Sequence, residues 1–176
     1  MRIDKFTTKF QQALSDAQSL AIGGDQQFIE PQHLLLALLN QDDGGTTSLL
    51  GRAGANVAGL RKDLEQALTR LPKVEGHGGD VSIGRDLGNL LNLTDKEAQK
   101  RGDQFIASEM FLLALCEDKG ETGRLAKQHG LTRKALDAAI MAVRGGQGVD
   151  SGGPGGMRKK MKKYYIDLTE RAAQGK

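Results

Sequence analysis

Residues 24–39 read GDQQFIEPQHLLLALL, and residues 102–116, about 77 positions further on, read GDQFIASEMFLLALC. In both stretches a turn leads into a short and strongly apolar segment. A unit that returns at a fixed spacing indicates an internal structural repeat whose copies pack on each other. We therefore expect two pseudo-symmetric units, and positions at which the copies differ chemically are the first candidates for function.

The composition favours helices packed on helices. Aromatic residues make up only 4% of the chain and Trp is absent, while Leu and Ala supply most of the apolar content, which is typical of helical proteins. Apolar residues recur at steps of three and four, which predicts helices over 5–21, 30–39, 47–53, 56–71, 86–101, 108–118, 122–128 and 132–144. We predict an all-α domain over 1–146 with two four-helix repeats, about 5–72 and about 83–146.

The C-terminal segment differs in composition from the rest. Seven glycines among residues 145–156 predict a flexible linker over 147–157, because such a segment buries too little apolar surface to become ordered. Residues 157–176 carry seven Lys/Arg and two acidic residues, so the net charge of +3 for the chain becomes −2 over residues 1–156. The basic segment is either solvated or in contact with phosphates, and the folded part gives no reason to expect nucleic-acid binding.

Motifs for catalysis are missing from the sequence. The chain has neither a phosphate-binding Gly-rich loop nor a dinucleotide-binding motif. His33, His77 and His129 are scattered, and Cys116 has no second cysteine with which to share a metal. The apolar run around Cys116 favours a small reduced core residue over a reactive thiol. We expect a non-catalytic segment with no cofactor and no metal.

The N-terminal residues do not have the pattern of a signal peptide. The first six residues include Arg2, Asp4 and Lys5, where a signal peptide needs an apolar region. No window approaches the length of a membrane span. We expect a cytoplasmic protein with no membrane partner.

The two copies disagree at two apolar positions of the second repeat. On a helical wheel of residues 86–101 the core stripe is completed by Leu87, Leu90, Leu91, Thr94 and Ala98. Leu93 falls well off that stripe, and its partner in the first repeat is Asp16. Met110 corresponds to His33, and methionine suits surfaces that accept many apolar shapes. Either Leu93 and Met110 line one exposed groove, or both pack against the other unit.

The ordered motifs of the chain resemble those of a known family. They are Phe6-x-x-Lys9-Phe10-x-x-Ala13-Leu14, the run from Ile29 to Leu39, Arg70-Leu71-Pro72, Gly102-Asp103-x-Phe105-Ile106, and the tail from Lys163 to Ala172. Together they resemble the N-terminal part of the ClpB family of disaggregases, which are ring-forming Clp/AAA+ chaperones of bacteria. The resemblance implies a double Clp repeat domain over 1–146 and, over 158–176, the start of a first ATPase module.

The resemblance also implies a function and a set of contact residues. It implies a domain that binds unfolded or aggregated polypeptides, in a homohexamer that uses ATP and magnesium and works beside the DnaK system; the segment itself would be monomeric. The positions that match substrate contacts of the family are Thr7, Leu91, Leu93, Asp103 and Glu109, with Met110 where leucine is usual. Glu97 replaces an apolar residue one turn after Leu93 and should narrow or shift the groove.

Three alternatives to this interpretation remain open. Asp103 and Glu109 flank the start of a short helix, where acidic groups are also favoured for structural reasons. The domain can equally be an adaptor-docking module, as in the ClpA and ClpC relatives. A third possibility is nucleic-acid contact through the basic residues 158–163.

Overall fold

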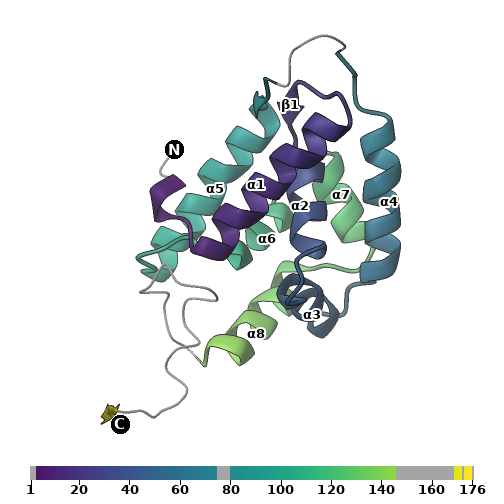
Figure 1. The fold of residues 1–176 in the computed structure, drawn as a ribbon. Helices are drawn as coiled ribbons and strands as arrows, with labels where there is room; N and C mark the ends of the chain where they lie inside the picture. The colour runs from purple at the N-terminus through teal and green to yellow at the C-terminus, as the bar shows by residue number, and fades with distance from the viewer. Residues whose placement is uncertain (1–2, 75–79, 146–168, 172, 176) are drawn as a thin grey trace.

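The computed structural model describes residues 3–74, 80–145, 169–171 and 173–175 (Figure 1). This part contains two successive sets of four α-helices, which confirms the all-α prediction. The first set is α1 (Thr8–Gly23), α2 (Pro31–Leu39), α3 (Gly45–Arg52) and α4 (Val57–Thr69). The second set is α5 (Arg85–Arg101), α6 (Ser108–Cys116), α7 (Glu121–Gln128) and α8 (Arg133–Arg144). The short elements are a 3₁₀ helix, Ile3–Lys5, and the strands β1 (Phe28–Ile29), β2 (Ser82–Ile83), β3 (Thr169–Arg171) and β4 (Ala173–Gly175).

Side-chain caps set several helix boundaries. The Thr7 hydroxyl accepts a hydrogen bond from the Phe10 backbone N–H, so α1 begins at Thr8 rather than at residue 5. Thr132 caps α8 in the same way through the Ala135 N–H. At the other end of α5, Gly102 adopts the left-handed conformation at a φ of 74°, which glycine reaches without strain. The predicted helices are therefore correct in number and order and differ by a few residues at their ends.

The core is centred on two short and strongly apolar helices, α2 and α6. All nine residues of α2 are buried, as are residues 110–115 of α6. The helix α2 contacts α1, α3, α4 and α5, so it joins the first repeat to the second. Phe6 stacks on Phe10 with ring centroids 4.5 Å apart, and Phe10 lies 6.1 Å from Phe111 of the other repeat. The two repeats thus share one core.

Contacts between the repeats come in symmetry-related pairs. Ile29 in β1 pairs in parallel with Ile83 in β2, and Phe6 forms an isolated parallel bridge with Ile106. Phe6 and Ile83 are equivalent residues 77 positions apart, as are Ile29 and Ile106, so one pairing is the copy of the other. The contact between α3 and α8 is matched by that between α7 and α4. The extended segments were not predicted, because two-residue strands are too short to show alternating hydrophobicity.

The predicted linker over 147–157 and most of the predicted ATPase start, residues 158–168, lie outside the described residues. Beyond them β3 and β4 pair antiparallel, with Thr169 opposite Gly175. The functional argument therefore concerns the two helical repeats.

Candidate functional site

The six predicted contact residues lie at very different depths. Leu93 on α5 is 39% exposed and the Glu109 side chain on α6 is 22% exposed. The others are buried: Thr7, Leu91, Met110 and the side chain of Asp103. An exposed groove made by Leu93 together with Met110 is therefore wrong for this structure. Met110 follows the packing alternative, because it is fully enclosed in the core shared by the two repeats.

The chemical difference between His33 and Met110 has a local structural cause. In the first repeat the His33 Nδ1 accepts a hydrogen bond from the Glu30 N–H at 2.9 Å, and its Nε2 lies 3.2 Å from the Gln26 Oε1. The ring proton is therefore on Nε2, and burial lowers the pKa of His33 to about 4. Met110 occupies the equivalent core position and supplies only apolar contact. The difference concerns helix capping and packing rather than binding.

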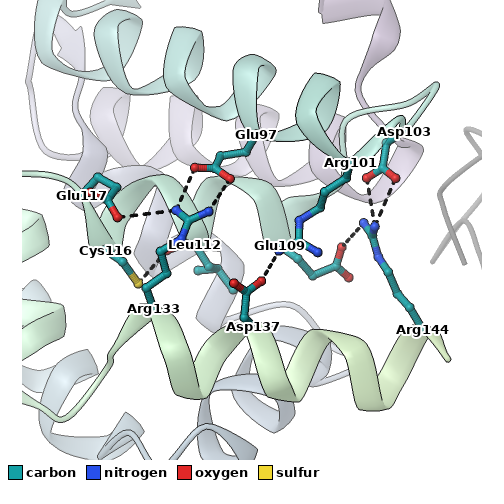
Figure 2. A network of polar contacts seen from close by, with 10 residues as sticks. All are labelled: Glu97, Arg101, Asp103, Glu109, Leu112, Cys116, Glu117, Arg133, Asp137 and Arg144. Carbon is teal, nitrogen blue, oxygen red and sulfur yellow. Dashed lines mark hydrogen bonds and ion pairs between the residues drawn. The ribbon is translucent and has the colours of Figure 1, made fainter. Parts of the chain in front are cut away.

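Asp103 and Glu109 both bind one buried arginine (Figure 2). Arg144 Nη1 lies 3.0 Å from Asp103 Oδ2, and Arg144 Nη2 lies 3.2 Å from Glu109 Oε1. We call these three residues the Arg144 clamp. The Asp103 carboxylate is enclosed against the Arg144 guanidinium of α8. Its role is therefore neither a direct contact with substrate nor only the stabilisation of a helix N-terminus.

Glu97 also turns toward α8 rather than toward a groove. Both its carboxylate oxygens accept hydrogen bonds of 2.8 Å from the Arg133 guanidinium (Figure 2). These bonds are the main reason that the pKa of Glu97 lies below its usual value. The prediction that Glu97 narrows or shifts an exposed groove is therefore wrong, because its side chain is nearly fully buried in an ion pair.

A cleft of about 560 Å³ lies between the repeats, at the junction of α1, α3, α6 and α8. Its apolar side chains are Leu49, Leu112 and Val143, of which Val143 is the exposed one. Its charged side chains are Lys9, Asp43, Arg52 and Glu109, with Lys9 and Asp43 ion-paired. The remaining lining residues are Gln41, Gly45, Thr46, Ser48 and Ser108. A volume of this size suits a few side chains of a bound peptide.

The equivalent place in the other half of the molecule is bridged. There Glu121 of α7 accepts a hydrogen bond of 3.0 Å from Gln32 and one of 2.9 Å from Arg70. The residue at the equivalent position in α3 is Gly45, which has no side chain, and Gln32 corresponds to Glu109. The cleft thus arises where a bridging side chain is replaced by hydrogen. Sequence reasoning missed it, although the mismatch of Gly45 with Glu121 was a signal that could have indicated it.

The described residues offer neither a metal site nor an activated thiol. Among the described residues no group of three or more His, Cys, Asp or Glu is arranged to hold a metal. Burial raises the pKa of the Cys116 thiol to about 11, which disfavours the thiolate. In the same part of the chain, every helix is too short or too polar to cross a membrane.

Comparisons with known proteins agree with this architecture. Residues 5–129 match the model of the Clp repeat (R) N-terminal domain. Over all 176 residues the chain is 53% identical to the chaperone protein ClpB of Vibrio cholerae serotype O1, and 47% identical to that of Pseudomonas putida. It spans only 20% and 21% of those proteins, respectively.

Solved structures share the fold. The Hsp104 N-terminal domain from Candida albicans aligns with a TM-score of 0.73 at 22% identity, covering 84% of this chain and 97% of that one. The N-terminal domain of the ClpV1 ATPase from E. coli aligns with a TM-score of 0.70 at 23% identity, covering 81% of this chain and 88% of that one. At these identities the likeness concerns the fold.

Proposed function

Because the chain belongs to the Clp repeat N-terminal domain family, we propose that it recognises exposed apolar segments of unfolded or aggregated proteins for an ATP-dependent chaperone. The cleft between α3, α6 and α8 is the observation that carries the proposal. It combines an apolar wall at Val143 with a charged rim, and it is open where the related half of the molecule is bridged by Glu121. Leu93 supplies a further exposed apolar side chain on α5.

The proposed binding is weak for one domain. Each apolar side chain that leaves water contributes about 1.5–3 kcal/mol, and association costs at least about 4 kcal/mol. Two or three such contacts therefore hold an unfolded segment only loosely. In the proposed parent protein, a homohexamer fuelled by ATP and magnesium and working beside the DnaK system, six domains on one ring raise the effective concentration. Substrate capture would then precede transfer to the ATPase ring.

A titration tests the proposal. We would add reduced, carboxymethylated lactalbumin, a permanently unfolded protein, and follow the backbone and methyl NMR signals of the chain. Signals of Leu49, Leu112 and Val143 are expected to shift most. A cleft-filling variant, Gly45→Glu with Glu109→Gln, copies the Glu121–Gln32 bridge into the cleft and should weaken binding at least tenfold, about 1.4 kcal/mol.

The matched control is Gly51→Glu with Glu109→Gln, which keeps the change at Glu109 and adds the same side chain to an exposed position of the same helix. This control should bind severalfold more tightly than the cleft-filling variant. Equal binding by the cleft-filling variant and the control would refute the cleft as the binding site. Shifts confined to the surface around Leu93 would relocate the site to α5.

The charged rim of the cleft favours one second candidate function, the docking of a folded adaptor. Arg52 and Glu109 offer charges of both signs, which suit a polar protein surface. An adaptor would bind with defined stoichiometry, whereas an unfolded polypeptide would compete with other unfolded chains for the same cleft.

A further inference from the structure

We propose that Arg144 is a positioning residue for the cleft, and that Asp103 affects polypeptide binding only by holding Arg144. The inference rests on the cleft-binding function proposed above. It gives Asp103 a role other than the direct substrate contact that the resemblance implies.

Asp103 is fixed in a place that a substrate does not reach. It follows Gly102, the left-handed residue that ends α5, and its backbone N–H donates to the Ala98 carbonyl at 3.0 Å. Its side chain has no exposed surface. A polypeptide on the surface of the domain therefore cannot bind this carboxylate without first opening the fold, and any effect of Asp103 on binding is transmitted by a neighbour.

Arg144 is the neighbour that faces both acids. It is the last residue of α8, and its side chain is only 4% exposed. One guanidinium contacts Asp103 after α5 and Glu109 in the first turn of α6, so it ties three segments of the second repeat together (Figure 2). Charge-assisted bonds of this kind are the stronger class of hydrogen bond. The end of α8 is thereby held against α5 and α6.

The clamp sits beside the exposed wall of the cleft. Val143 immediately precedes Arg144 and lines the cleft opposite α3, and Glu109 lines the cleft as well. The last turn of a helix frays unless it is held. Anchoring Arg144 therefore fixes Val143 in place and keeps the cleft in its open shape before a polypeptide arrives.

A double-mutant cycle with Asp103→Asn, Arg144→Met and both together tests the inference. Affinity for reduced, carboxymethylated lactalbumin and amide hydrogen exchange of residues 141–144 are measured on each variant. Each single substitution should weaken binding about fivefold and speed exchange at the end of α8 about tenfold. The double variant should be no worse than the poorer single variant, because both changes remove the same link.

Additive losses of affinity would overturn the inference, as would a loss of binding in Asp103→Asn with unchanged exchange at the end of α8. Arg144→Lys keeps the charge and should restore part of the protection. The control for general destabilisation is Leu64→Val, which removes one methylene group from a buried side chain of α4 and should change neither readout. If wild-type binding maps away from the cleft, the proposed function fails, while coupled exchange in the cycle still reports on the clamp.

Discussion

The last helices of the two repeats, α4 and α8, are held in place by different chemistry. Along α8 three charged residues, Arg133, Asp137 and Arg144, form ion pairs with residues in or next to α5 and α6. The equivalent residues of α4 are Val57, Arg61 and Leu68. There the contacts that replace the ion pairs are hydrogen bonds to uncharged acceptors. Gln26 donates to the Leu68 carbonyl at 3.5 Å, and Arg61 donates to the Leu39 carbonyl at 2.9 Å and to the Asn40 side chain.

This difference leads us to expect that the fold does not need the ion pairs of α8. The first repeat closes the same four-helix unit with uncharged partners for Arg61 and Leu68, and buried ion pairs add little net stability over apolar packing. Removing one partner of a buried pair, however, is strongly destabilising, because the other charge stays buried without compensation. The ion pairs of α8 therefore fix the position of that helix, which borders the cleft. The first repeat, whose helix α4 has other residues at the equivalent positions, can be compared with it directly.

The largest effect on stability is expected when Arg144 of the clamp is replaced by leucine, the residue (Leu68) at the equivalent position of the first repeat. Arg144→Leu leaves the buried Asp103 carboxylate without its guanidinium, and should lower the free energy of unfolding by about 3–5 kcal/mol. Urea unfolding followed by circular dichroism measures the change.

The complete exchange sharpens the same comparison. Arg144→Leu combined with Asp103→Gln and Glu109→Gln copies Leu68, Gln26 and Gln32 of the first repeat. This triple variant should recover most of the stability lost by Arg144→Leu alone. If it is as unstable as the single variant, the charges are required for the fold and the neutral design of α4 does not transfer.

The second effect concerns the buried histidine of the first repeat. His33→Met copies Met110 and removes the partner of the Glu30 N–H and of the Gln26 Oε1, at a cost of about 2 kcal/mol at pH 7. The folded pKa of His33, about 4, lies below its ordinary value of 6.5. Wild-type stability from the neutral ring is therefore complete above pH 6.5 and is lost as the pH falls toward 4, by about 3 kcal/mol. Between pH 7 and 4, the free energy of unfolding should fall more steeply with falling pH in the wild type than in His33→Met.

The repeat pattern predicted the number and order of the helices because burial follows helical periodicity strongly. The stripe from Leu87 to Ala98 on α5 is buried as expected, and Leu93, off that stripe, is exposed. Subtracting one copy from the other singled out Leu93 and Met110, of which Leu93 is exposed and Met110 is enclosed in the core. The comparison could not predict which of the two side chains is buried. The helix α6 is apolar around much of its circumference, so a helical wheel does not show whether Met110 faces the core or the solvent.

The ion pairs were beyond sequence reasoning for a different reason. Asp103 and Arg144 are 41 positions apart, and Glu97 and Arg133 are 36 apart. Pairing at such separations depends on how α8 docks, which no local pattern encodes. The cleft escaped prediction because the copies were compared only at apolar positions of the second repeat, whereas its signal is Gly45 of the first repeat against Glu121 of the second.

A smaller effect is expected at the second ion pair. Glu97→Leu copies Leu20 of the first repeat and leaves Arg133 partly exposed and still 3.5 Å from Glu117, so stability should change by no more than about 1 kcal/mol at pH 7. Since Arg133 lowers the folded pKa of Glu97, the wild type keeps this contribution above pH 4.5 and loses it as the pH falls further. Acid titration of stability below pH 4.5 should be shallower in Glu97→Leu. Arg133→Val, which strands the buried carboxylate, should be the more damaging of the two changes.

The smallest effect on stability, and the most direct test of the surface, is the exchange at Leu93. Leu93→Asp places the residue of the first repeat, Asp16, on α5 at a site that is already 39% exposed, so unfolding should change by less than about 1 kcal/mol. If unfolded polypeptides contact α5 as well as the cleft, affinity should fall severalfold in this variant. The reciprocal change, Asp16→Leu, presents the same leucine at the equivalent position of α1 in the first repeat. Gain of binding by Asp16→Leu would mean that any exposed leucine suffices, whereas loss in Leu93→Asp without gain in Asp16→Leu would tie recognition to the second repeat.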